Sequence, residues 1–186
     1  MILLDYGHHF TRLVAASIGL VALEAAVAAL APEFRRPPAG VELEFAAYGA
    51  LHALTLVSSL PTRIARSRQA LFVATAAALS VATAALGLAL LHRTAQLGGA
   101  VPVLAGAAAL GALAYAGAIG GVLGGRCAGR AAALAPPLCA AAAAAVYPLA
   151  RQVPSGALGL VFALPWWFAF SGALWFAGAR RPSATK

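Results

Sequence analysis

Long stretches of apolar residues dominate this chain, and short gaps that carry polar and charged residues separate them. The stretches cover residues 13–31, 43–60, 70–91, 101–123, 131–150 and 157–177. Each contains about 18–23 residues, which is enough for an α-helix to cross a hydrocarbon layer of about 30 Å. Because the stretches are apolar on every side, they lack the alternating pattern of membrane β-strands. The pattern predicts an all-α fold, a polytopic transmembrane helix bundle of about six spans, in a single integral-membrane domain over residues 1–186.

Composition argues against a soluble protein. Hydrophobic residues make up 62% of the chain and charged residues 10%, against roughly 45–50% and about 25% in soluble domains. The first stretch ends in Ala29-Leu30-Ala31, as a signal peptide does, but Pro32 follows directly and Glu24 interrupts the stretch. We therefore expect the first stretch to be retained as a helix.

Basic residues alternate between rich and poor gaps along the chain. The gaps rich in basic residues hold Arg63, Arg66, Arg68, Arg126, Arg130, Arg180, Arg181 and Lys186. The poor gaps hold Arg93, Arg151 and the pair Arg35 and Arg36. The charge of that pair is offset by the nearby Glu33, Glu42 and Glu44. Cytoplasmic loops carry the excess of Lys and Arg. The alternation predicts cytoplasmic termini and a multi-pass protein of the cell inner (cytoplasmic) membrane. The net charge of +8 forms no basic face, so it favours contact with anionic lipid headgroups over binding of nucleic acid.

Two ionisable side chains fall well inside the apolar stretches, Glu24 in the first and His52 near the centre of the second. A charge inside a bilayer is costly, so such a residue indicates a functional site. A rise of about 1.5 Å per residue places both side chains near the middle of the bilayer. Consecutive helices joined by a short loop usually pack together, so we expect Glu24 and His52 to approach each other.

The second stretch also carries a polar face. Tyr48, His52, Thr55 and Ser59 follow helical spacing, so they share one side of a helix that should face the bundle interior. The third stretch adds Ser80 and Thr83 on one face. One interpretation is a polar pathway or binding site in which Glu24 and His52 relay protons. The other is a hydrogen-bonded contact between helices.

Small residues and aromatic residues mark further helix surfaces. Gly117, Gly121 and Gly125 are four residues apart, which permits close packing within the bundle, the expected use, or between subunits. Prolines at 136, 137, 148 and 165 should kink the last two helices. Trp166 and Trp167 could line a cavity, but packing or contact with lipid is the expected role.

The chain offers little for catalysis or cofactor binding. It has no zinc-protease or serine-nucleophile motif, and its two cysteines, Cys127 and Cys139, match no metal or redox spacing. His8 and His9 should lie at the cytoplasmic end, His52 at the centre and His92 at the outer end, so no two helices offer histidines at one depth for a haem. We therefore expect no catalytic residue, cofactor or metal.

These features favour a transport or permeation component for a small solute or ion, with a polar site at mid-membrane. A non-catalytic subunit or assembly factor of a larger membrane complex is the alternative. An intramembrane enzyme that acts on a lipid or polyprenyl substrate, with Glu24 and His52 as acid and base, is less favoured because carboxylates are scarce. The expected partners are the lipid bilayer, a small solute, and other membrane subunits or copies of the chain.

Overall fold

The computed structural model describes residues 6–30, 39–59, 65–94, 99–123, 125–153 and 158–179. These residues form six helices: α1 (Tyr6–Leu30), α2 (Ala39–Ser58), α3 (Arg66–Thr94), α4 (Ala100–Leu123), α5 (Gly125–Ala150) and α6 (Leu158–Ala179). The described part of the chain contains no strand. The predicted all-α fold is therefore confirmed, and each apolar stretch of the sequence corresponds to one helix.

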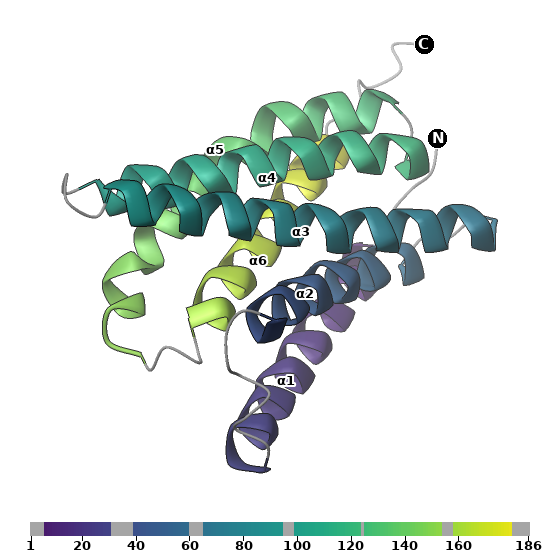
Figure 1. The fold of residues 1–186 in the computed structure, drawn as a ribbon. Coiled ribbons are helices and arrows are strands. Elements are labelled where there is room, and N and C mark those ends of the chain that lie inside the picture. Colours follow the sequence, from purple (N-terminus) through teal and green to yellow (C-terminus); the bar gives the residue numbers. More distant parts are fainter. Residues whose placement is uncertain are drawn as a thin grey trace, which may run out of the picture.

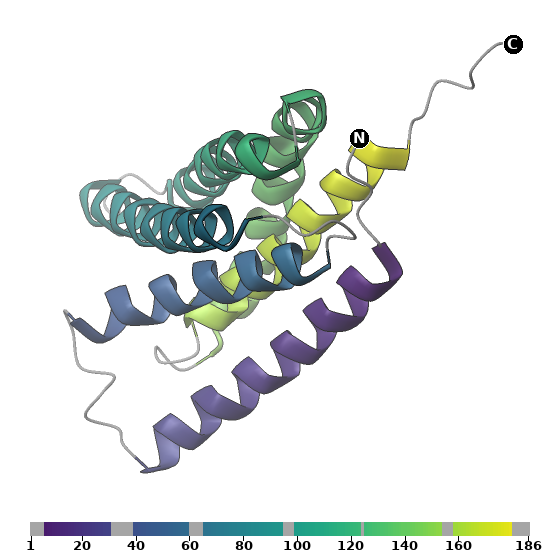
Figure 2. The same ribbon diagram turned by 90° about the vertical axis from the view of Figure 1, so that its right-hand side faces the viewer.

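The helices form a bundle in which neighbours in sequence pack together. α3 lies beside α4, and α4 beside α5, whereas α6 crosses behind them (Figure 1). α2 packs against α3 and contacts α6. α1 packs against α2 and α6 near its N-terminal end and then diverges from α2 (Figure 2). This divergence leaves much of α1 exposed, for example Ile18 at 65% and Leu30 at 83%.

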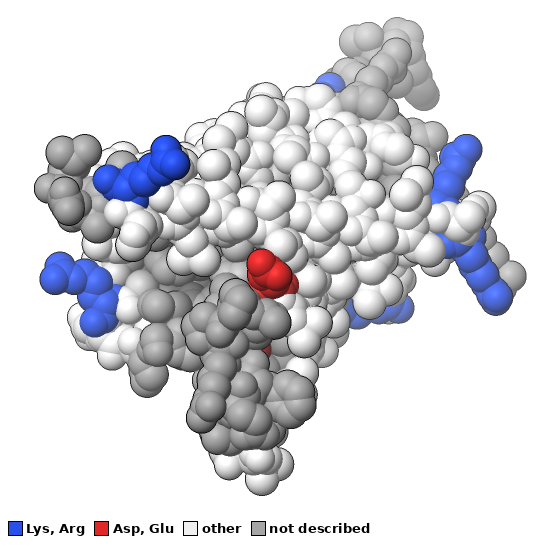
Figure 3. Space-filling view, in the orientation of Figure 1, with Lys and Arg blue, Asp and Glu red and all other residues white. Residues whose placement is uncertain are grey.

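The bundle surface matches a bilayer environment. Five helices, all but α2, are long and apolar enough to cross a membrane. α2 is also the shortest helix, with 20 residues, and it carries Glu42 in its first turn. Figure 3 shows Lys and Arg side chains at opposite ends of the molecule with an uncharged surface between them, interrupted by acidic groups near the start of α2. Such a band between charged ends fits a lipid bilayer.

Small residues allow the helices to approach closely. The largest core cluster includes fully buried alanines from five helices: Ala53, Ala76, Ala112, Ala135 and Ala173 are examples, one from each. Close backbone approach of this kind is the usual basis of helix packing in lipid, where apolar burial alone gives little drive for association. α5 contains Pro136, Pro137 and Pro148 and bends part-way along its length (Figure 1), as prolines inside a helix require.

Candidate functional site

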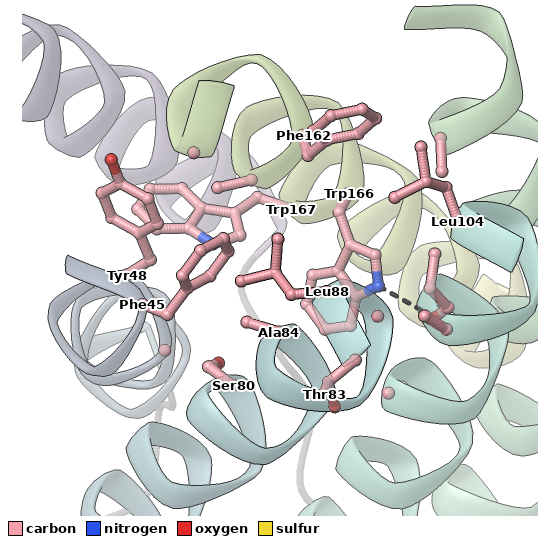
Figure 4. A pocket seen from close by; sticks show the side chains of 18 of the residues that line it. Phe45, Tyr48, Ser80, Thr83, Ala84, Leu88, Leu104, Phe162, Trp166 and Trp167 are labelled. Carbon is pink, nitrogen blue, oxygen red and sulfur yellow. Dashed lines mark hydrogen bonds between the residues drawn. The ribbon is translucent and has the colours of Figure 1, made fainter. Parts of the chain in front are cut away.

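A cavity of about 430 Å³ opens into the bundle between α2, α3, α4, α5 and α6 (Figure 4). Its lining comes from the first part of α2, α4 and α6 and from the middle and last part of α3 and α5. Since consecutive helices run in opposite directions, these parts lie in the same half of the bundle, away from the two termini. The cavity is therefore confined to one half of the bundle.

Aromatic side chains form much of the cavity wall. Figure 4 shows Phe45 and Tyr48 of α2 beside Trp167 of α6, with Trp166 and Phe162 of α6 further along the cavity. Trp166 Nε1 donates a hydrogen bond to the backbone oxygen of Ala108, 3.1 Å away on α4. This bond fixes α6 against α4 and holds the indole in place at the cavity.

His52 lies at the inner limit of the cavity and is fully buried. Its Nδ1 is 3.0 Å from the hydroxyl of Tyr115 on α4, and its Nε2 is 3.3 Å from the hydroxyl of Ser171 on α6. The imidazole stacks on Trp167, with ring centroids 5.5 Å apart and an interplanar angle of 24°. Trp166 meets it edge-on at 5.8 Å. Both ring nitrogens are thus occupied, and the orientation of the ring is fixed by three helices.

Two carboxylates converge on Tyr48. Its hydroxyl is 3.2 Å from Glu24 Oε1 on α1, and it also forms a hydrogen bond with Glu44, one turn earlier on α2. A phenol has a single proton to donate, so Tyr48 can serve one of these two carboxylates at a time. Glu44 lines the cavity with Tyr48, which places negative charge at the cavity wall.

Small residues bring α2 close to its neighbours around this site. A Cβ placed on Gly49 would lie 2.5 Å from the backbone oxygen of Ala76 on α3. A Cβ placed on Gly159 would overlap the Glu44 carboxylate. Glycine at these two positions therefore permits the contacts of α2 with α3 and α6 that border the cavity.

The predicted polar face of α2 is confirmed as a buried face. Tyr48, His52, Thr55 and Ser59 are each at most 6% exposed. The face divides into two parts, because Tyr48 and His52 line the cavity and the other two do not. Thr55 and Ser59 donate to backbone oxygens of their own helix, at His52 and Thr55 respectively, a common arrangement of hydroxyl groups in helices. Ser80 and Thr83 of α3 do line the cavity, as their shared face indicates.

The expected approach of Glu24 to His52 stays a prediction, and the hydrogen bonds of the two residues run to other side chains. Glu24 bonds to Tyr48, whereas His52 bonds to Tyr115 and Ser171. Tyr48 lies one turn away from His52 on α2, and its hydroxyl is 3.2 Å from Glu24 Oε1. These hydrogen bonds give the two ionisable groups different partners.

The sequence led us to expect that no two helices carry histidines at the same depth, and this expectation is wrong for His9 and His52. His9 belongs to α1 rather than to a segment before it, and it is fully buried. Its Nε2 lies 2.9 Å from the same Ser171 hydroxyl that His52 approaches. α1 and α2 are tilted relative to each other, so a count of residues along straight helices does not give their depths.

Trp166 and Trp167 do not face lipid. Trp167 is 2% exposed, and both residues line the cavity. Pro165 immediately precedes them inside α6. Trp175, nearer the end of α6, is 44% exposed, which fits contact with the membrane interface.

The two described glycines of the α4 series, Gly117 and Gly121, do not pack against another described helix of this chain. Gly117 and Gly121 are exposed, and nothing lies within 4 Å of a Cβ placed on either. The surroundings of Gly125 lie outside the described residues. The expected packing inside the bundle is therefore wrong for the first two glycines, and contact between subunits stays a prediction. Gly111, by contrast, packs against Thr83 of α3.

Four residues of the site were not singled out from the sequence: His9, Glu44, Tyr115 and Ser171. Signals for three of them were present. Glu44 extends the polar face of α2 by one turn, because it stands four residues before Tyr48. Tyr115 and Ser171 are the sole residues with a hydroxyl group in their helices, and an isolated hydroxyl in an apolar helix often marks a contact between helices.

Comparisons with protein-family models, with curated proteins and with solved structures found no match to this chain. The geometry of the site is therefore the basis for the functional argument. Cys139 is a buried free cysteine, and no group of three or more potential metal ligands occurs among the residues that the structure describes.

Proposed function

We propose that this protein is a transport or permeation component of the inner membrane that takes a small, largely apolar solute with a cationic group into the cavity. The observation that carries the proposal is the cavity itself, which joins an aromatic wall to a carboxylate within a bundle of apolar helices. Its volume of about 430 Å³ falls within the range typical of small-molecule sites.

The aromatic wall supports a solute that is mostly apolar. Burial of apolar surface supplies most of the affinity in such sites, and a few polar groups set the orientation. The hydroxyls of Ser80 and Thr83 from α3 are suited to that second role, since both side chains lie at the cavity (Figure 4).

The charges near the cavity support a cationic group on the solute. Glu44 lines the wall, and Tyr48 links it to Glu24. Faces of Trp, Tyr and Phe rings attract cations as well. Arg151 also borders the cavity, but its side chain is exposed at the end of α5, where water screens its charge.

Binding of tetraphenylphosphonium, a bulky aromatic cation, tests this proposal. The chain in lipid nanodiscs should bind it in equilibrium dialysis beyond the level of empty nanodiscs. Glu44→Gln should lower the affinity about tenfold, or about 1.4 kcal/mol, since it removes the charge at the wall. Glu42→Gln, on an exposed residue two positions earlier, serves as the matched control. Equal affinity in the unmodified chain, Glu44→Gln and Glu42→Gln, or no binding by the unmodified chain, would contradict the proposal.

Uptake provides the second part of the test. Glu24→Gln should abolish pH-dependent accumulation of tetraphenylphosphonium in proteoliposomes, because it removes a titratable group bonded to Tyr48. Unchanged pH dependence would separate Glu24 from transport.

A role as a subunit of a larger membrane complex is the second candidate. The exposed Gly117 and Gly121 favour it, because they form a small-residue surface on α4 that no described helix of this chain covers. This candidate predicts that the protein extracted from its native membrane in mild detergent has a particle mass well above that of one chain. A monomer of 18.6 kDa would contradict it.

The geometry gives less support to an enzyme acting on a lipid or polyprenyl substrate. That candidate requires Glu24 and His52 to act on one reacting group as acid and base. Their separate hydrogen-bond partners do not provide such an arrangement.

A further inference from the structure

We infer that His52, Ser171 and His9 form a proton relay that connects the inner limit of the cavity with the half of the bundle that holds the termini. The inference deepens the proposed function. It rests on that function because the relay would couple the movement of the solute to the movement of protons. It stands on three side chains from three helices that meet inside the bundle.

Ser171 is the centre of this arrangement. Its hydroxyl lies 3.3 Å from Nε2 of His52 and 2.9 Å from Nε2 of His9. All three side chains are fully buried. A serine hydroxyl has one proton to donate and lone pairs to accept others, so it can accept from one imidazole while donating to the other.

The tautomers of the two histidines set the directions of these hydrogen bonds, and one assignment runs the same way through all three groups. In it the Tyr115 hydroxyl donates to Nδ1 of His52, Nε2–H of His52 donates to Ser171, and Ser171 donates to Nε2 of His9. This assignment leaves the proton of His9 on Nδ1. That atom is the one buried side-chain nitrogen or oxygen without a hydrogen-bond partner among the described residues.

This assignment allows a proton to pass along the chain with all atoms accounted for. The Tyr115 hydroxyl, which lines the cavity, gives its proton to Nδ1 of His52 and takes up another proton from the cavity, so that His52 becomes an imidazolium. It then passes its Nε2 proton to Ser171, which gives its own hydroxyl proton to Nε2 of His9. His9 is now the imidazolium and releases its Nδ1 proton. One proton and one positive charge have moved from His52 to His9.

The release point faces the terminal half of the bundle. The backbone of Thr55 lies next to the His9 ring, and the Thr55 oxygen accepts hydrogen bonds from the hydroxyls of Ser58 and Ser59. Ser58 is exposed, and its backbone oxygen accepts a hydrogen bond from Arg12. Polar groups thus continue from His9 toward the surface at this end.

Few other titratable or charged groups face the relay. Tyr115 from α4 and Tyr48, one turn away on α2, are the tyrosines near His52. Trp166, Trp167 and Phe170 from α6 cover the rest of its ring. Arg12, one turn after His9 on α1, points to Ser58. Both histidines are therefore linked through a hydroxyl group, which can accept and donate a proton, as a relay requires.

Proton flux in liposomes tests the relay. The full chain is reconstituted with the pH dye pyranine inside, a pH gradient is imposed with valinomycin and potassium present to balance charge, and tetraphenylphosphonium is added. The unmodified protein should collapse the gradient faster than protein-free liposomes do. Ser171→Ala and His9→Gln should reduce the rate to that of protein-free liposomes, because each removes one link.

Matched variants separate the relay from a role in folding. Ser171→Thr keeps a hydroxyl and should keep the flux. His8→Gln and His92→Gln, on exposed histidines, should conduct like the unmodified protein. Thermal unfolding of Ser171→Ala and His9→Gln in detergent, compared with that of the unmodified protein, shows that both variants fold.

The outcomes distinguish the relay from the proposed function. Flux that survives Ser171→Ala, or no flux through the unmodified protein, overturns the relay even where tetraphenylphosphonium binds. Flux that depends on Ser171 in a protein that does not bind tetraphenylphosphonium supports the relay and overturns the proposed solute class instead.

Discussion

Tyr48 connects two helices through one hydroxyl group. It bonds to Glu24 on α1 and to Glu44 on its own helix. Other polar links of α1 to the bundle run from Arg12 to Ser58 and from His9 to Ser171. The bond between Tyr48 and Glu24 therefore contributes to holding the middle of α1 against α2.

A double-mutant cycle tests that bond. Tyr48→Phe and Glu24→Gln should each destabilise the protein, and the double variant should lose less than the sum. Coupling energies between membrane helices average about 0.6 kcal/mol and reach about 1.7 kcal/mol. We expect a value in this range from unfolding titrations in detergent. The matching cycle of Glu24→Gln with His52→Gln should give coupling near zero, because distant groups act additively; a larger coupling there would favour direct contact of Glu24 with His52.

The contact between α2 and α3 depends on a glycine. At Gly49, a Cβ would lie 2.5 Å from the Ala76 backbone oxygen and would overlap the Ser80 hydroxyl. A side chain can rotate away, but a backbone oxygen moves only with its helix. Since α2 borders the cavity along this contact, separating the two helices also changes the cavity wall.

Gly49→Ala should therefore destabilise the protein by about 1–3 kcal/mol, the usual cost of overpacking. Gly19→Ala on α1 is the matched control, because nothing lies within 4 Å of its Cβ position; it should be neutral or stabilising by up to about 1 kcal/mol. Thermal unfolding of both variants in the same detergent gives the comparison. Equal melting temperatures would contradict the close approach of α2 to α3.

The sequence allowed prediction of the helices better than prediction of the site. Apolar stretches of membrane length determine the helices because lipid leaves the backbone no other hydrogen-bond partners. The helical spacing of Tyr48 and His52 was sufficient to predict their burial. The partners of His52 were not predictable, because Tyr115 and Ser171 are distant in sequence and meet it through the tilt of α4 and α6. The same tilt explains why His9 reaches Ser171 when residue counting placed it at another depth.

The two ends of the molecule differ in their content of arginine, and this difference should determine its orientation in the membrane. Arg66 and Arg68, from an arginine-rich gap, belong to the first turn of α3, and Arg93, from a poor gap, belongs to its last. The two kinds of gap therefore lie at opposite ends of this helix, and Figure 3 shows basic side chains at both ends of the molecule. The positive-inside rule predicts that the Arg66 end is cytoplasmic and that the cavity lies in the outer half.

Arg66→Cys and Arg93→Cys, each in a chain whose Cys127 and Cys139 are replaced by alanine, test this directly. Both positions are exposed, so burial does not prevent labelling of either one. A membrane-impermeant maleimide added to intact cells should label the cysteine at position 93 and reach that at position 66 only after the membrane is broken. The reverse pattern would place the cavity on the cytoplasmic side, and the relay would then carry protons from the cavity toward the outer surface.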